Sequence, residues 1–224
     1  MARPAGTVQT LDRGLRVLEL LADAPAGRPV SELSAALGVH RAIVYRLLAT
    51  LAAHRLVRAQ DGRYRLAAGL VALARGVAPR LQAAAMPELA RLAEEAGATA
   101  TLTVADGEEA VALAVVEPRH TAIHVAYRPG LRHPLTRGAP GRAILVGRPP
   151  AAGEPAAIAA DRARGYSVSS GEIQPGASGL AAPIPGADAS IGVVSFGQPD
   201  ESLAARVIAA AAAVAEELGP SQAT

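Results

Sequence analysis

Two short apolar stripes separated by a glycine constrain the first quarter of the chain more than any other feature of the sequence. Leu33 and Leu37 lie four residues apart, as on one helix face, and Gly38 follows at once. A glycine here can adopt the left-handed conformation that ends a helix. The next helix is predicted from His40. Its apolar stripe has the i, i+3, i+4, i+7 spacing of a packed face and comprises Val44, Leu47, Leu48 and Leu51.

Further elements are predicted on both sides of this helix pair. A helix is expected from Thr10 to the turn at 25–29, and Ser31 is expected to cap the next helix. The first helix is predicted to bury Leu11, Leu15, Leu18 and Leu21. Downstream, Asp61-Gly62 separates two strand-like segments, 56–60 and 63–66, and tolerates the positive φ angles of a tight hairpin. Three helices and a hairpin in this order predict a winged helix-turn-helix over residues 1–66.

Charge is distributed unevenly along the chain. All 22 basic residues are arginine, so the number of arginines by itself indicates little. Residues 1–80 hold 12 Arg and 5 acidic residues, a net charge of +7, whereas residues 81–224 hold 10 Arg and 15 acidic residues, a net charge of −5. A cationic N-terminal part suits a polyanionic partner, and we expect it to bind double-stranded DNA.

Composition excludes several classes of protein. Without cysteine the chain has no disulfide, zinc finger, iron–sulfur cluster or thiol nucleophile. The N-terminal segment lacks the apolar core of a signal peptide. The longest late apolar stretch, 207–215, is less than half of the ~20 residues that a spanning helix needs. We therefore expect a cytoplasmic protein without membrane association.

Enzymatic motifs are absent as well. The sequence contains no nucleophile elbow, Walker loop or dinucleotide fingerprint, so no catalytic activity and no cofactor are expected. His120, His124 and His133 lack a paired carboxylate motif, which disfavours a metal site. The acidic residues of the same region are interpreted as a solvated sheet edge, namely Glu108, Glu109 and Glu117.

The remainder of the chain predicts an α+β domain over residues 83–224, preceded by a linker helix at 67–82. Strands are predicted at 99–104, 110–116, 121–127, 180–184 and 191–196. Helices are predicted at 87–97, 140–146 and 201–218, and flexible surface at 147–155. The expected architecture is an antiparallel sheet flanked by helices.

The segment VSELSAALGVHRAIVYRLLATLAAHRLVR, with the hairpin RYRLAAGLVALARG after it, resembles the DNA-binding domain and linker helix of the IclR family of bacterial transcription regulators. Weaker motifs agree in order: LARLAEEAGATATLTVADGEEAV, PGLRHPLTRGAPGRAIL, RARGYSVSSGEIQPGASGLAAPI and IGVVSFG. The resemblance extends over residues 7–218. It implies a winged helix joined through a linker helix to a GAF-like effector-binding domain, assembled as homodimers or dimers of dimers on palindromic operators.

Arginine side chains on the third helix suggest how DNA would be read. Arg41 and Arg46 project from its early turns, and arginine can make a bidentate contact to guanine. The candidate DNA-binding residues are His40, Arg41, Ala42, Tyr45, Arg46 and Thr50 on the helix, and Arg58, Arg63 and Arg65 on the hairpin. His40 serves equally well as a helix cap. Each arginine, taken singly, also fits the solvated face of an amphipathic element.

In the IclR family the effector pocket lies under the loop that here reads TRGAPGRA, residues 136–143. The resemblance implies as candidate effector-binding residues Leu135, Gly138, Ala139, Gly141, Ser169, Gly179, Val194 and Phe196. The small residues of the loop are predicted to leave room for a ligand, and the amides after it to receive a carboxylate; a tight turn explains the glycines equally well. Polar groups usual in the family are replaced at 169, 179, 194 and 196. We predict an apolar or aromatic acid as effector, or a pocket without ligand.

These observations predict a transcription regulator controlled by a small-molecule effector. Ala42 and Ile43 stand where the family usually has Ser and Thr, which predicts narrower base readout. Both a repressor and an activator fit this organisation. The alternative is a catalytic or purely ligand-binding α+β protein that carries the helix-turn-helix as an accessory interaction module.

Overall fold

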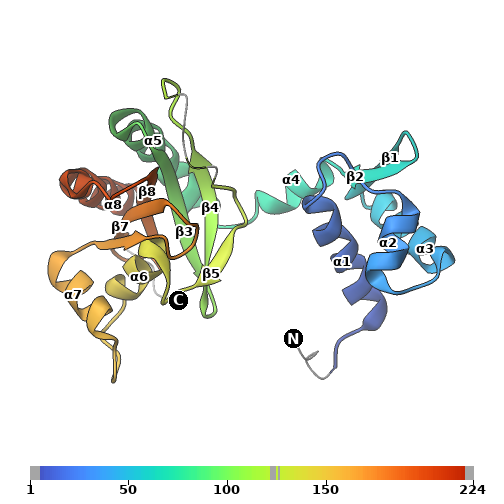
Figure 1. Ribbon diagram of the computed structural model, residues 1–224, viewed down its shortest axis with the longest axis horizontal. Coiled ribbons are helices and arrows are strands. Elements are labelled where there is room, and N and C mark those ends of the chain that lie inside the picture. Colours follow the sequence, from blue (N-terminus) through green and yellow to red (C-terminus); the bar gives the residue numbers. More distant parts are fainter. Residues whose placement is uncertain (1–5, 122–124, 126, 220–224) are drawn as a thin grey trace. The chain divides into compact units, whose positions relative to one another are not determined.

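The computed structural model describes residues 6–121, 125 and 127–219, and the chain divides into two units, Met1–Val77 and Ala78–Thr224 (Figure 1). The N-terminal unit contains α1 (Gln9–Ala22), α2 (Val30–Leu37), α3 (Arg41–Ala53), the hairpin β1 (Val57–Gln60) and β2 (Arg63–Leu66), and the short α4 (Gly69–Ala74). This order confirms the predicted helix-turn-helix and hairpin. The domain boundaries predicted at residues 66 and 82 stay a prediction.

The turn between α2 and α3 follows the chemistry of its residues. Gly38 ends α2 in the left-handed region, with φ of 64°. The two helices are bent by 109° at this break, within the range of a helix-turn-helix. The predicted stripe of α3 is buried and packs against Val17, Leu21 and Leu33. No single helix of the described residues is long and apolar enough to cross a membrane; α2 and α3 meet that test only when taken together.

Two local predictions about the first helices are wrong. Leu11 and Leu15 are 62% and 51% exposed, because the face of α1 that meets the core is centred on Val17 instead. Ser31 does not cap α2, because the helix already begins at Val30 after Pro29, which places Ser31 inside the first turn.

The hairpin forms at the predicted turn. Asp61 and Gly62 have φ angles of 51° and 71°, the paired positive values of a two-residue type I′ turn. A backbone bridge between Arg28 and Tyr64 attaches β2 to the segment before α2. The hairpin is thereby fixed beside the helix-turn-helix.

The predicted linker helix at 67–82 is wrong, because the structure has two helices there. The chain leaves helical geometry after α4, and Ala78 has a φ of 42°. α5 (Pro79–Ala96) then begins at Pro79, since proline suits the first turn of a helix. Pro87 lies inside α5 and does not start it, which corrects the prediction for that residue.

The C-terminal unit is an α+β domain built on one antiparallel sheet. Its six strands have the order β5-β4-β3-β8-β7-β6. They are β3 (Thr99–Asp106), β4 (Glu109–Val116), β5 (Arg132–Pro134), β6 (Ser167–Ser170), β7 (Ala177–Pro183) and β8 (Ala189–Phe196). The helical elements are α5, α6 (Gly138–Gly147), α7 (Ala156–Arg164), η1 (Glu201–Leu203) and α8 (Ala204–Leu218). The fold class is as predicted.

Four of the predicted strands are confirmed with small changes of length. Of the fifth, at 121–127, residues 122–124 and 126 lie outside the described residues, and Thr121, Val125 and Tyr127 are not in a strand. β5, β6 and α7 were not predicted. Residues 147–155 lie mostly at the surface, where Arg162 of α7 donates to the carbonyl of Arg148 at 2.7 Å and forms an ion pair with Glu154.

Helices cover both faces of the sheet (Figure 1). Alternation along β7 separates the two layers: Leu180 and Ala182 belong to the large core under α5 and α8, whereas Ala181 packs with Ala139 and Ala143 of α6. Alanine on the α6 side lets this helix lie close to the sheet. The candidate pocket is on the α6 side.

Candidate DNA-binding face and ligand pocket

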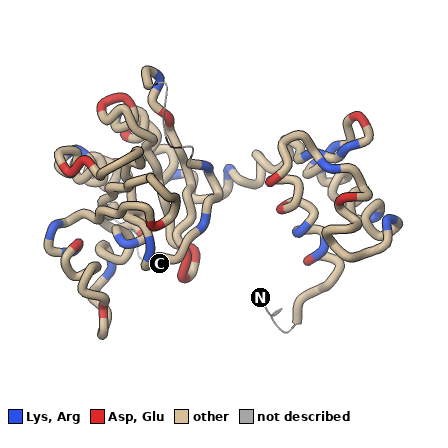
Figure 2. Tube along the Cα trace, viewed as in Figure 1, with Lys and Arg blue, Asp and Glu red and all other residues tan. Residues whose placement is uncertain are grey.

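The outward face of α3 carries the predicted arginines. Arg41, Ala42, Tyr45 and Arg46 are exposed, with Tyr45 55% exposed. Basic residues recur over the N-terminal unit, including its hairpin (Figure 2). An open groove of about 340 Å³ separates the start of α3 from the hairpin. Its lining includes Arg41 and Tyr45 on one side and Ala59, Gly62 and Tyr64 on the other.

The free guanidinium groups are found at three of the predicted positions. Among the described residues no hydrogen bond or ion pair engages the side chains of Arg41, Arg46 or Arg58. An arginine without an internal partner keeps all its donors for phosphate or base edges. These three side chains therefore form the best-supported part of the candidate DNA face.

Three of the other predicted DNA contacts, His40, Thr50 and Arg63, already have hydrogen-bond partners within the unit. His40 is the N-cap of α3, and its Nδ1 accepts from the amide of Ala42 at 3.3 Å. The Thr50 hydroxyl donates to the carbonyl of Arg46 at 3.1 Å, a bond within the helix. Arg63 donates to the carbonyl of Gly27 at 3.1 Å and lies 3.7 Å from Glu32. Arg65 is partly buried against Gly27, and its Nε is buried without a hydrogen-bond partner among the described residues.

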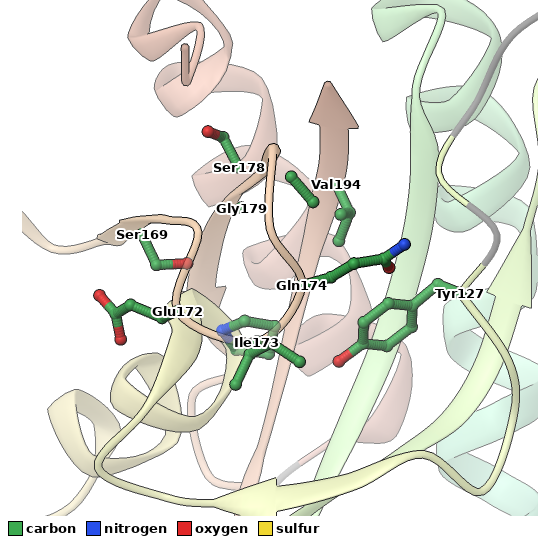
Figure 3. A pocket seen from close by; sticks show the side chains of 10 residues that line it. Tyr127, Ser169, Glu172, Ile173, Gln174, Ser178, Gly179 and Val194 are labelled. Carbon is green, nitrogen blue, oxygen red and sulfur yellow. The ribbon is translucent and has the colours of Figure 1, made fainter. Parts of the chain in front are cut away.

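The pocket of the C-terminal unit lies on the α6 side of the sheet (Figure 3). Three predicted residues form a row across it, because Ser169 of β6 pairs with Gly179 of β7, which pairs with Val194 of β8. The cavity has a volume of about 20 Å³, room for about one water molecule. It is lined by Tyr127, Pro140, Ser169, Glu172, Ile173, Gln174, Ala177, Ser178, Gly179 and Val194.

The other five predicted effector residues do not line this cavity. Leu135 is buried in a cluster with Ala110 and Ile144, and Phe196 is 51% exposed at the end of β8. Ala139 packs under the sheet against Ala181. Gly138 and Gly141 do not leave the predicted room for a ligand. A Cβ on Gly138 would lie 2.8 Å from Ile173 Cγ1, and one on Gly141 would lie 2.7 Å from the carbonyl oxygen of Leu135.

The amides at the start of α6, predicted to receive a ligand's carboxylate, already have partners. The Gly138 amide donates to Glu172 Oε2 at 2.8 Å, and the Ala139 amide donates to Ser169 Oγ at 2.8 Å. Arg142 holds the second oxygen of Glu172 at 2.7 Å and binds Asp161 at 2.9 Å. The protein thus supplies its own carboxylate at this helix terminus, which corrects the prediction of exposed amides.

Tyr127 is the pocket residue that sequence reasoning missed most clearly. It is 6% exposed, and its hydroxyl has no hydrogen-bond partner among the described residues. Burial raises the pKa of this phenol to about 12, so the hydroxyl is uncharged at neutral pH and can donate. The rarity of aromatic residues could have drawn attention to Tyr127, because the chain has only four tyrosines and one phenylalanine.

The histidines that the structure describes do not gather into a metal centre. His120 Nδ1 lies 2.8 Å from Glu94 Oε2, an exposed pair that lowers the pKa of Glu94. His133 is buried on β5, and His124 lies outside the described residues. Among residues 6–121, 125 and 127–219, no group of three or more His, Asp or Glu side chains could hold a metal ion.

A winged helix-turn-helix with free arginines, followed by an α+β unit with a small buried pocket, defines the organisation of a DNA-binding transcription regulator. The IclR helix-turn-helix domain matches residues 10–61. The HTH-type transcriptional regulator BhcR of Paracoccus denitrificans is 30% identical over 209 residues, which cover 82% of this chain and 74% of that protein. The chain therefore belongs to the IclR family of transcription regulators.

Solved structures share the fold over nearly the whole chain. An IclR transcriptional regulator from Alicyclobacillus acidocaldarius has a TM-score of 0.77 at 24% identity, covering 95% of this chain and 100% of that one. An IclR homologue from Microbacterium hydrocarbonoxydans, in complex with 4-hydroxybenzoate, has a TM-score of 0.78 at 22% identity, covering 93% and 98%.

Proposed function

We propose that this regulator binds a palindromic operator in double-stranded DNA through α3 and the β1–β2 hairpin. The proposal rests on the exposed pair Arg41 and Arg46 on α3, neither of which has a partner within the described part of the chain. Their side chains read base edges, since bidentate contacts to guanine specify sequence. Arg58 on β1 contacts phosphate and contributes affinity without sequence preference.

The operator-bound form is a homodimer or a dimer of dimers. Two apolar surfaces of the N-terminal unit support association. Leu11 and Leu15 on α1 are 62% and 51% exposed, and Val71 and Leu73 on α4 are 59% and 64% exposed. Exposed apolar side chains gathered along helices are characteristic of surfaces that a partner covers. A second copy supplies the matching surface, and two-fold symmetry matches a palindrome.

The C-terminal unit holds a small, mostly apolar effector in the pocket between α6 and the sheet. This assignment is supported by the row of paired strand residues Ser169, Gly179 and Val194 and by the apolar side chains around it. Binding shifts the population of operator-competent dimers, provided that the effector favours one arrangement. The protein acts in the cytoplasm and catalyses no reaction of its own.

Footprinting on the protein's own promoter region tests this function. We expect two half-sites whose centres are one helical turn, or a multiple of one, apart. We also expect operator affinity to fall by about 10³-fold or more between 50 and 200 mM salt, because several phosphates are contacted. A uniform footprint without sequence preference would instead favour the accessory-module alternative.

A matched pair of variants controls for charge. Replacing both Arg41 and Arg46 by alanine is expected to abolish the footprint. Replacing Arg119 and Arg128, two exposed arginines of the C-terminal unit, by alanine removes the same number of positive charges and should retain the footprint. Equal loss in both would refute the assignment of the α3 face.

A further inference from the structure

The start of α6 is occupied by a carboxylate that belongs to the protein itself. Glu172 accepts from the Gly138 amide at 2.8 Å and pairs with Arg142 Nη1 at 2.7 Å. Arg142 is 12% exposed and Glu172 is 31% exposed, so the guanidinium of this ion pair is mostly buried and the carboxylate is partly open to solvent. Arg137 also donates to the backbone carbonyl of Glu172. The Glu172 side chain thus occupies the space that an acidic ligand would need, and it already binds the Gly138 amide and the Arg142 guanidinium.

The loop that carries Glu172 also forms the wall of the cavity. Residues 171–176 connect β6 to β7 between two glycines with positive φ, 67° at Gly171 and 78° at Gly176. Ile173 and Gln174 project beside Tyr127, while Glu172 lies toward Ser169 (Figure 3). Because Gln174 is exposed, its side chain can move outward at low cost and enlarge the cavity, while Glu172 stays anchored.

Tyr127 provides the polar group that a ligand could engage. Its buried hydroxyl lies at the cavity without a partner among the described residues, and an unpaired buried donor is unfavourable. The neighbouring hydroxyls are engaged, because Ser169 accepts from Ala139 and Ser178 donates to the carbonyl of Gly197. Most of the remaining lining is hydrocarbon, from Pro140, Ile173, Ala177 and Val194.

We propose that this cavity takes an uncharged ligand whose oxygen accepts a hydrogen bond from Tyr127, and that Glu172 is the residue that excludes carboxylic acids. This inference rests on the proposed effector-responsive function. Suitable classes are amides, alcohols, aldehydes and ketones with a small apolar skeleton. A ligand carboxylate would have to displace Glu172 or lie beside its negative charge in a partly buried site, and like charges at short range repel.

Isothermal titration calorimetry on the full chain tests whether uncharged ligands bind more tightly than carboxylates of the same shape. Two pairs of ligands are compared. The pairs are propionamide with propionate, and benzamide with benzoate, so that shape is constant while charge changes. We expect the tighter-binding amide to exceed its carboxylate by at least about tenfold in affinity. Equal binding, a preference for the carboxylate, or no binding of any of the four would overturn the proposal.

Single variants distinguish the role of Glu172 from the role of Tyr127. Glu172→Gln retains an oxygen that can accept from Gly138 but removes the charge, and should raise carboxylate affinity about tenfold while amide affinity changes little. Tyr127→Phe should weaken amide binding by about fivefold and leave the preference for amide over carboxylate in place. An unchanged ratio in Glu172→Gln would refute its role as the excluding residue, and melting curves verify that each variant is folded.

Gel-shift titrations of the same proteins distinguish this inference from the proposed function. Amide binding without any change of operator affinity would uphold the ligand class and overturn effector control. Operator binding by a protein that binds none of the four ligands would overturn the ligand class and leave the proposed DNA binding in place.

Discussion

The two units use the same residue in opposite ways. In the N-terminal unit, Arg41, Arg46 and Arg58 project to solvent without internal partners among the described residues. In the C-terminal unit the typical arginine is paired. Examples are Arg132 with Asp106 at 2.5 Å, Arg142 with Asp161 at 2.9 Å, and Arg148 with Asp188 at 2.7 Å.

This difference teaches that placement, and not composition, gives an arginine its role. The guanidinium is always charged and offers five donors. Where acidic residues are near, those donors hold the fold together; where they are absent, the donors remain available for a polyanion. The net charges of +7 over residues 1–80 and −5 over residues 81–224 follow the same division.

The largest effect is expected where a paired arginine is removed. Arg142→Ala leaves Asp161, which is 2% exposed, without its main buried counter-ion. Arg164, which is 40% exposed, stays paired with Asp161. We expect the free energy of unfolding to fall by about 3 kcal/mol, because a buried carboxylate that keeps only a partly exposed counter-ion is costly. Urea unfolding measures it.

Arg148→Ala is the matched control for this prediction. Its partner Asp188 is 55% exposed, so the ion pair should be worth less than about 1 kcal/mol. Equal losses from the two variants would show that burial does not separate the two kinds of pair.

A smaller effect, on binding and not on stability, is expected where a free arginine is removed. Arg46→Ala should weaken specific operator binding by about 1–3 kcal/mol, roughly 5- to 150-fold. The unfolding midpoint should stay within about 1 °C of the wild type, because the side chain is exposed and has no partner in the part of the chain that the structure describes. Gel-shift titration and thermal unfolding measure the two quantities, and unchanged operator affinity would contradict the assigned recognition face.

The smallest effect concerns the pH dependence of the C-terminal unit. Burial lowers the pKa of His133, whose Nε2 is buried without a partner among the described residues. Below about pH 6.5 the unfolded chain binds a proton that the folded protein resists, so this contribution to stability is lost as pH falls. The loss is at most about 1.4 kcal/mol per pH unit.

Urea unfolding between pH 7 and pH 5 measures this contribution. His133→Gln should lose less stability across this range than the wild type does. His54→Gln, at the exposed end of α3, should keep the wild-type slope. A wild-type slope in His133→Gln would contradict the assignment.

Local patterns in the sequence predicted the N-terminal unit well. The α3 stripe, the Gly38 stop and the Asp61-Gly62 turn each depend on residues close in the chain, and all three were confirmed. The α1 face was predicted wrongly. Several apolar residues compete for that face, and only contacts with α2 and α3 select Val17 over Leu11 and Leu15.

The pocket could be predicted only in part. The resemblance to relatives selected Ser169, Gly179 and Val194, which strand register then placed in one row. Tyr127 and Glu172 carried no local pattern, because their roles depend on packing across long separations in the chain. The glycines at 138 and 141 were misread for the same reason: the atoms that fill the space beside them belong to Ile173 and Leu135.

The sequence by itself determined the family, the helix-turn-helix with its hairpin, and the excess of positive charge in the N-terminal part, because these depend on spacing and composition within short segments. Only the tertiary structure decided which arginines are free and which hydroxyl is unpaired. It also decided that a glutamate occupies the start of α6. Hydrogen bonds and ion pairs between side chains depend on distances that the fold sets. Glu172, for example, lies 34 residues along the chain from the Gly138 amide that it binds.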